Sequence, residues 1–496
     1  MFNRIIFLPK KRYIYKQKLK YSNPKIKVVK GHKNKLIIRL LNILNKNISN
    51  ANLIFLIFIF LFCQINTSKN IELRELNNNN FIIITIYGIG DLSIINETYG
   101  SLITSIKIND NEEISENINV VQNFDSTNTN TIKISFDNQL NSINSIFKNL
   151  QNITNINLTN LDFSLITDME SSFEGCISLK SVDLSNIDAS KVTSMKNMFK
   201  DCKLLESVNF SNFKTEKVKT LEQIFFGCET ITSIDLSSFE TSDLILLSGS
   251  FNGCKSLTYV NLDNFQTSKV TRMDFMFKDC NSLPFLNLNN FNTESVQYMN
   301  NMFDQCHSFT FLNLSNFKTP SLLKMNSMFY NNKNLLSLDV SNFNTTLVSD
   351  MGQVFDSCHS IKSLNLSNFY TPATISIFHM FYGCYQLEFL DMSNFNTERI
   401  KNMQNLFINC RSLKSLNLSS FNTSNVETME SMFIACINLE ILDISSFDTK
   451  SVKSMSNMFK NCNKLKSLDL KHFYTPNLEK MNERMKYFVH VILYYT

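Results

Sequence analysis

Cysteine is the residue type whose number and spacing could support chemistry in this chain. Of 12 cysteines among 496 residues, eleven follow one series with a step of 26 residues, and the single skipped position holds Asn332. The series comprises Cys176, Cys202, Cys228, Cys254, Cys280, Cys306, Cys358, Cys384, Cys410, Cys436 and Cys462. Two interpretations are open: a disulfide framework, as expected of a secreted protein, or a buried ladder of reduced thiols.

The regular spacing favours the reduced ladder. Neighbouring cysteines would lie roughly 4.8 Å apart and point the same way if each coil of a repeat carries one. Their number is odd, and Asn replaces one of them. Asn and Cys interchange at a buried leucine-rich-repeat position where the side chain bonds loop backbone. We therefore expect a structural Cys/Asn ladder.

Other residue patterns give no sign of catalysis. His307 and His359 occupy the same repeat position two coils apart, roughly 10 Å by strand spacing. That distance is too long for a shared metal. The sequence has no glycine-rich phosphate loop, no C-x-x-C pair and no G-x-S-x-G motif. We expect no catalytic residue, no metal ligand and no cofactor, and the Asp/Asn spacing fits no known calcium loop.

The elements that position the cysteines repeat with the same step. Phe keeps the period from Phe173 through Phe459, and a second Phe column runs from Phe213 to Phe473. A fixed period of this size is typical of a solenoid. In the unit from Cys410 to Cys436, Leu416 alternates with polar neighbours, which predicts a short strand with one buried face.

The second half of each unit predicts a short helix. Residues 426–433 place Val, Met, Met and Phe at spacings of three, three and one, and Ser424 is the candidate N-cap. The residue before the cysteine position tolerates a left-handed backbone, as a helix C-cap requires. It is Gly175, Gly227, Gly253 or Gly383 in four coils, Asn331, Asn409 or Asn461 in three, and Asp201 or Asp279 in two.

These features predict an α/β solenoid over residues 143–485. We expect a leucine-rich-repeat-like, right-handed array of about 13 coils of 26 residues, with a parallel β-sheet face. Residues 69–142 lack the period but contain alternating apolar stretches, within 81–90, 101–108 and 131–136, which predict strands. A β-rich N-terminal cap is the economical interpretation, with a separate binding module as the alternative. Residues 486–496 form a C-terminal tail.

The N-terminal segments suggest export. Residues 1–50 hold 14 Lys/Arg and no Asp/Glu, and we expect this basic arm to be disordered. The rest of the chain has 34 basic and 43 acidic residues, which argues against nucleic-acid binding. Within residues 51–68, Leu53–Cys63 is uninterrupted apolar sequence. It fits a signal peptide, a membrane signal anchor or a buried core helix, and the first two place the protein outside the cell or on its surface.

The repeat resembles that of a known family. SLKSLNLSSFNTSNVETMESMFIAC (Ser412–Cys436), TSKVTRMDFMFKDC (Thr267–Cys280) and SLDVSNFNTTLVSDM (Ser337–Met351) are similar to the repeat of the BspA-like leucine-rich-repeat surface proteins. The resemblance implies surface display and protein binding, and adhesion is attributed to some members. It transfers no ligand, because the family shares no binding residue. Ile187, Ser250 and Asn332 depart from the pattern at packing positions.

The strand side chains that point away from the core should line a concave face. One column alternates acid and amide and includes Asn261, Asn287 and Asn313. The neighbouring column is mostly Ser, but it carries aromatic residues on three consecutive coils and apolar residues in two later ones. These are Tyr259, Phe285, Phe311, Phe389 and Ile441. Together with the three asparagines, the four aromatic residues are our candidate partner-binding set; chance drift in a biased composition is the alternative.

The chain also carries sequons for N-glycosylation. They start at Asn96, Asn152, Asn157, Asn209, Asn313, Asn344, Asn365, Asn417 and Asn422. Of these, Asn157, Asn209, Asn313, Asn365 and Asn417 start sequons in the Asp/Asn column. In a glycosylating host, some of these asparagines would carry sugar.

Three functions remain open. The first is a non-enzymatic surface or secreted adhesin or receptor-like module with an unidentified protein ligand. The second is a coat or scaffold protein that self-associates. The third is an enzyme with its chemistry in residues 69–142, which the absence of His between Ser68 and Ser142 disfavours.

Overall fold

The computed structural model describes residues 80–479 except 110, 117, 125–127, 467, 469 and 471. The chain divides into two units, Met1–Glu75 and Leu76–Thr496. The basic arm, the apolar run Leu53–Cys63 and the C-terminal tail lie outside the described residues. No helix in the described part is long and apolar enough to cross a membrane.

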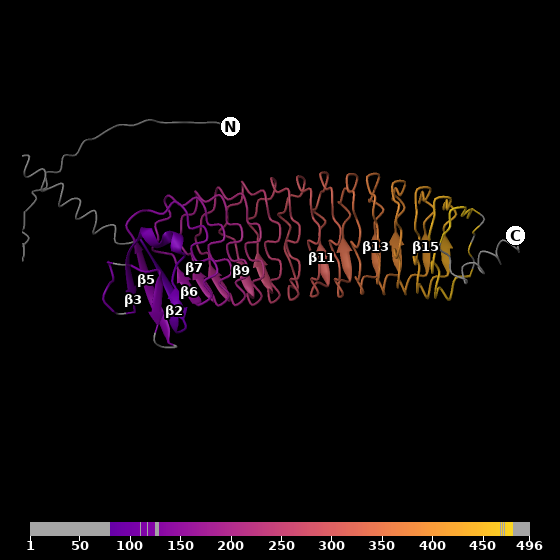
Figure 1. Ribbon diagram of the computed structural model, residues 1–496. Coiled ribbons are helices and arrows are strands. Elements are labelled where there is room, and N and C mark those ends of the chain that lie inside the picture. Colours follow the sequence, from indigo (N-terminus) through magenta and orange to yellow (C-terminus); the bar gives the residue numbers. More distant parts are fainter. Residues whose placement is uncertain are drawn as a thin grey trace, which may run out of the picture. The chain divides into compact units, whose positions relative to one another are not determined.

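A group of antiparallel strands precedes the repeats (Figure 1). The elements are β1 (Phe81–Tyr87), β2 (Gly90–Ser93), the 3-10 helix η1 (Glu97–Leu102), β3 (Ile103–Ile108), β4 (Val121–Phe124) and β5 (Thr129–Phe136). Strands β1, β3 and β5 belong to one sheet, and β2 and β4 form a separate two-stranded sheet. The strands expected from the apolar alternation are confirmed, and Ile82, Ile84 and Ile86 of β1 are fully buried. Strand β1 pairs antiparallel with β5 on one side and with the first repeat strand, β6, on the other. This pairing covers the open edge of the first coil.

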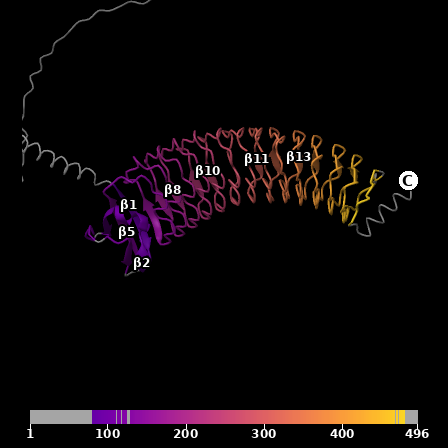
Figure 2. The same ribbon diagram turned by 45° about the horizontal axis from the view of Figure 1, so that its top comes forward.

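The repeats form a stack of coils with parallel strands (Figure 2). The strands are β6 (Ile153–Asn157), β7 (Ser181–Asp183), β8 (Ser207–Asn209), β9 (Ser233–Asp235), β10 (Tyr259–Asn261), β11 (Phe311–Asn313), β12 (Ser337–Asp339), β13 (Ser363–Asn365), β14 (Phe389–Asp391), β15 (Ser415–Asn417) and β16 (Ile441–Asp443). Strands β6, β7 and β8 extend the sheet of the cap, and the later ones pair two by two. The predicted class, a leucine-rich-repeat-like solenoid with a parallel sheet face, is confirmed.

Eleven repeat strands are formed in the described residues, against about 13 coils expected. One expected strand, at residues 285–287, is absent. Pro284 lacks the N–H that Thr258 and Leu336, at the same position in nearby coils, donate to the preceding coil. The last expected strand, at 467–469, falls partly on residues that are not described.

The predicted helix in each coil is wrong. No α-helix occurs in the described residues, and the segment holds consecutive turns instead. Each such segment contains two left-handed residues four positions apart, such as Asn197 and Asp201 at φ 55° and 58°. The left-handed conformation expected before each cysteine is therefore confirmed, but the second left-handed residue prevents a helix. Ser424 is accordingly not a helix N-cap; its N–H bonds the side chain of Asn422 at 3.1 Å.

The turn segments bond to each other as well as to themselves. The N–H groups of Asn197 and Phe199 donate to carbonyls of the next coil at 2.9 and 2.8 Å. Between them, the N–H of Met198 donates to the carbonyl of Met195 within its own coil at 3.3 Å. This alternation satisfies the backbone groups that a helix would have satisfied internally.

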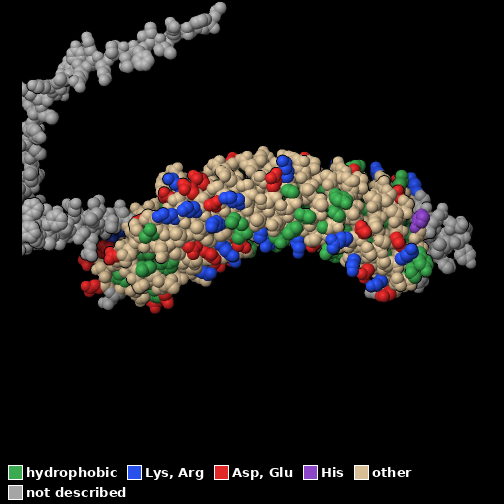
Figure 3. Space-filling view, turned by 90° about the horizontal axis from the view of Figure 1, so that it is seen from above, with side chains coloured by type: hydrophobic (Ala, Val, Ile, Leu, Met, Phe, Trp, Pro, Cys, Tyr) green, Lys and Arg blue, Asp and Glu red, His purple; other side chains and the backbone are tan. Residues whose placement is uncertain are grey.

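Columns of identical side chains fill the interior of the stack. The rings of the first Phe column stack on one another from Phe147 to Phe459, with centroids 5.0 to 6.0 Å apart. A column of buried Thr links neighbouring coils: Thr319 Oγ1 donates to the carbonyl of Asn344 at 2.9 Å and accepts its N–H at 2.8 Å. At the surface, ion pairs such as Lys148–Glu174 (2.9 Å) and Lys196–Glu222 (3.1 Å) also join successive coils. Figure 3 shows acidic and basic side chains interspersed on one face.

Candidate binding surface

The aromatic residues predicted on the strand face are exposed. Tyr259, Phe285 and Phe311 occupy one position in three consecutive coils, and their exposed fractions are 54%, 67% and 52%. Tyr259 begins β10 and Phe311 begins β11, while Phe285 lies in the coil between them, where no strand forms. We call these three residues the aromatic stripe. Phe389 and Ile441 are equally exposed, at 54% and 66%, but stand on separate later coils.

The aromatic stripe lies within a stretch of the strand face whose adjacent column is uncharged. The residue just before the strand position is charged in the early coils (Lys180, Glu206) and again in the later ones (Lys362, Glu388, Lys414, Glu440). In the five coils between them it is Thr232, Thr258, Pro284, Thr310 and Leu336. Sequence reasoning missed this column, although its period is readable in the sequence. Depletion of charge around exposed aromatic residues is typical of the centre of a protein interface.

The neighbouring Asp/Asn column is used by the fold. The Oδ1 atoms of Asn261 and Asn313 each accept the N–H of the residue two positions later, at 3.1 Å. Asn287 does the same at 3.2 Å, and its Nδ2 also donates to Asp263 at 2.9 Å. These bonds form the turn that ends each strand position. The three asparagines flank the aromatic stripe, but part of their hydrogen-bonding capacity is already taken.

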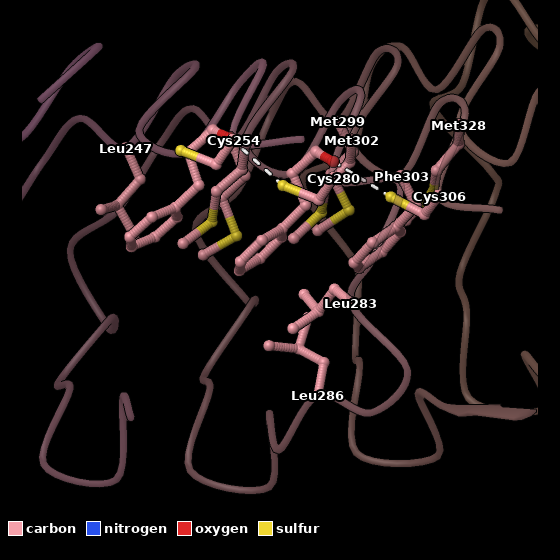
Figure 4. Close-up of a cluster of buried hydrophobic side chains, with 14 of the residues drawn as sticks. Leu247, Cys254, Cys280, Leu283, Leu286, Met299, Met302, Phe303, Cys306 and Met328 are labelled. Carbon is pink, nitrogen blue, oxygen red and sulfur yellow. Dashed lines mark hydrogen bonds between the residues drawn. The ribbon is translucent and has the colours of Figure 1, made fainter. Parts of the chain in front are cut away.

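The ladder cysteines are free thiols in the structure. Ten are buried and Cys462 is partly exposed. Each Sγ donates to the carbonyl of the Phe 29 residues earlier, at 2.9 to 3.3 Å, as with Cys280 and Phe251 (3.2 Å). Figure 4 shows the side chains of Cys254, Cys280 and Cys306 aligned in parallel, with the last two bonded to the preceding coil. Burial raises the pKa of these thiols, to about 12 for Cys176 and Cys358, so they stay protonated and poorly reactive.

Asn332 makes the same contact as the cysteines it replaces. Its Nδ2 donates to the carbonyls of Phe303 at 2.8 Å and Phe329 at 2.9 Å. The first of these is the bond that a cysteine would make at this position. Its Oδ1 is buried without a partner. The ladder therefore serves to bond coil to coil.

The described residues contain no group of three or more His, Cys, Asp and Glu side chains able to hold a metal ion. His307 bonds the carbonyl of Asn331 at 2.9 Å, and His359 stacks on Tyr385 at 4.4 Å. A hollow of about 520 Å³ lies where β1 meets β6, β7 and β8. Asp183 is the single titratable residue among those that line it. Neither the surroundings of these two histidines nor the lining of the hollow brings together an acid, a base and a nucleophile.

A family comparison accounts for the whole repeat region. The family described as "Mycoplasma protein of unknown function, DUF285" matches residues 141–257, 220–333, 245–369, 309–389 and 375–491. The chain belongs to this family. The match spans the 26-residue repeats on which the resemblance to the BspA-like proteins rests, and the fold confirms these repeats as structural units.

Structural comparisons find other leucine-rich-repeat proteins. A leucine-rich cell surface protein from Faecalibacterium prausnitzii is 16% identical, with a TM-score of 0.36, covering 67% of this chain and 82% of that one. An LRR protein from Leptospira interrogans is 13% identical, with a TM-score of 0.21, covering 67% of this chain and 93% of that one. These scores are too low for either likeness to bear on function. A search of curated proteins found no match.

Proposed function

We propose that this protein is a non-enzymatic surface or secreted protein that binds another protein through the strand face of its solenoid. The observation that carries the proposal is the exposed aromatic stripe. It lies in a five-coil stretch in which the residue just before each strand position is uncharged. The three aromatic side chains are exposed at one position in consecutive coils, and exposed aromatic residues that gather on one face of a soluble protein tend to mark interaction sites.

Surface display belongs to the same proposal. The basic arm and the apolar run Leu53–Cys63 support export or anchoring, as does the resemblance of the repeat to that of the BspA-like surface proteins. An adhesin or receptor-like role follows if the partner belongs to another cell or to its matrix. Glycosylation is part of this proposal only in a host that modifies sequons; Asn313 is exposed beside Phe311, so a glycan there would shield the stripe.

The test replaces the three stripe residues with Ser, the residue found at this position in most other coils. We expect Tyr259→Ser/Phe285→Ser/Phe311→Ser to abolish binding to partner-bearing cells while the melting temperature stays unchanged, because the side chains are exposed. The matched control is Ser363→Ala/Ser415→Ala, at the same position in later coils. Undiminished binding by the triple variant would refute the proposal.

The coat or scaffold alternative predicts a different outcome. A protein that binds copies of itself should show concentration-dependent association in sedimentation experiments, and the triple variant should lose it if the stripe is the contact. A monomer at all accessible concentrations favours a foreign partner.

A further inference from the structure

Another column of side chains lies four residues before the position that the aromatic stripe occupies, and its charge changes along the stack. In early coils it holds Lys203, Glu229 and Lys255, and Lys255 pairs with Glu229 at 3.1 Å. From residue 281 to residue 463 the column contains no acid. Five consecutive members form what we call the basic ladder: His307, Lys333, His359, Tyr385 and Arg411.

Contacts between coils hold the rings of the basic ladder in order. The ring of His359 stacks on Tyr385 with centroids 4.4 Å apart, and the guanidinium of Arg411 lies 4.8 Å from the centroid of the same ring. Behind them, Asn334 Nδ2 donates to the carbonyl of His307 at 2.9 Å, and Asn438 Nδ2 donates to that of Arg411 at 2.8 Å. The side chains of His359, Tyr385 and Arg411 therefore form a preorganised surface rather than three independent groups.

The cations of the ladder are not neutralised locally. Lys333 and Arg411 are exposed, and neither makes an ion pair with any described residue, in contrast to Lys255 in the same column. Lys362 and Lys414 follow His359 and Arg411 by three residues and are likewise exposed and without an ion pair to the described part. The acids nearby are the exposed Glu388, the buried Asp356, and Glu440, which pairs with Lys466 and also interacts with the charge of Lys414.

Asp356 is already engaged within the fold. It accepts a bond from Ser357 Oγ at 2.8 Å and lies 3.5 Å from the Nδ1 of His379. It therefore makes no ion pair with Lys333 or Arg411, although its charge still acts on His359.

We propose that the basic ladder binds a linear acidic polysaccharide lying along the axis of the stack. The two permanent cations, Lys333 and Arg411, stand three coils apart, roughly 14 Å at one strand spacing per coil. A linear polysaccharide that carries a carboxylate or sulfate on each ring, or on alternate rings, presents more than one anion over that length. Charge complementarity is local, since the chain beyond residue 50 is acidic overall.

The same contacts argue against a nucleic acid. Proteins that bind single strands offer free aromatic faces on which bases stack. Here one neighbour of Tyr385 covers its ring by stacking and another by a cation–π contact, so this ring offers no free platform. A DNA duplex carries a charge about every 1.7 Å, far denser than the cations of the ladder.

Protonation should strengthen this binding. His359 becomes a cation at low pH, so the ladder gains positive charge as pH falls. Burial, together with Lys333, lowers the pKa of His359, while Asp356 acts in the opposite direction. The contribution of His359 therefore appears below the pH at which an ordinary histidine titrates.

The test titrates the full chain with a size-defined heparin oligosaccharide, and with a single-stranded oligonucleotide of equal charge, at several salt concentrations. The variant is Lys333→Gln/Arg411→Gln. The matched control is Lys255→Gln, which removes a paired cation from the same column. We expect the double variant to lose roughly tenfold in heparin affinity for each cation removed, the usual value of a charged hydrogen bond. The salt dependence should fall by about one unit of slope per cation.

Any of three results would overturn the proposal. Heparin could fail to bind at low salt, the control could lose as much affinity as the double variant, or the oligonucleotide could bind as tightly as heparin. None of these results bears on the aromatic stripe, because the ladder variants leave its residues intact and the stripe variants leave the ladder intact.

Discussion

Alkaline pH should unfold this solenoid abruptly, because the fold buries ten protonated thiols. A cysteine in an unfolded chain has a pKa of roughly 8.5. Burial raises the pKa in the folded state, to about 12 for Cys176 and Cys358 and well above the usual value for Cys202, Cys228, Cys280 and Cys384. Since the folded pKa is the higher one, each thiol contributes its full stability below the unfolded pKa. That contribution is lost as pH rises toward the folded pKa.

The size of the effect follows from the number of thiols. Each one costs about 1.4 kcal/mol of unfolding free energy per pH unit above its unfolded pKa. Ten thiols cost on the order of 14 kcal/mol per unit if the array unfolds as one body, and proportionally less if groups of coils unfold separately. Typical domains are stable by only about 5–15 kcal/mol. The unfolding transition should therefore fall within one or two pH units above the pKa of an unfolded cysteine, roughly 8.5.

The assay is urea unfolding followed by circular dichroism between pH 7 and pH 10.5, with reductant present. The matched variant is Cys280→Asn, which introduces the residue that the protein already has at Asn332 and removes one titrating group. Its stability should fall less steeply with pH than the parent, by about 1.4 kcal/mol per unit. A parent midpoint that is flat from pH 8 to pH 10 would refute the reasoning, as would identical slopes for parent and variant.

Two further predictions concern single ladder positions. Asn332→Ala should cost about 2–4 kcal/mol, because it leaves the carbonyl of Phe303 without its side-chain donor and removes a second bond to Phe329. Asn332→Cys should recover most of that loss, and chemical denaturation of both variants would show whether it does. Among the ladder cysteines, Cys462 should react first with a thiol reagent at pH 8, since it is partly exposed and its contact with Cys436 lowers its pKa. Mass spectrometry after brief labelling checks this, and a buried ladder cysteine that reacted before Cys462 would contradict it.

The stacking of the coils could be predicted from the sequence because the same residue type recurs at the same position of each repeat. The Cys and Phe columns fixed the period, and the Leu alternation around Leu416 fixed the short strand. The left-handed residue before each cysteine was also predictable, because Gly, Asn and Asp share that tolerance. These are properties of single columns, which a sequence displays directly.

The helix was predicted wrongly because apolar spacing does not distinguish a helix from a compact run of turns. Val426, Met429, Met432 and Phe433 face the core in either case. The deciding residue is the second left-handed one, and it is chemically varied, with Asn197, Phe275 and His379 at equivalent positions. Its backbone is set by hydrogen bonds to the next coil, which no local propensity records.

The candidate surface was predictable in part. Exposure of the aromatic stripe follows from the strand alternation, and the uncharged column beside it could have been read from the same period. The hydrogen bonds by which Asn261 and its equivalents form the turns at the strand ends could not be predicted from the sequence, because they depend on the backbone geometry.

The most direct test of the central claim is site-specific photo-crosslinking from the strand face. A photoreactive phenylalanine analogue replaces Phe285 in the full chain, and a second protein carries it at Ser207, the same position outside the stripe. On partner-bearing cells we predict an adduct between residue 285 and one foreign protein, with none from residue 207. Adducts with copies of this chain alone, or equal adducts from both positions, would contradict the proposal that the aromatic stripe binds a protein partner.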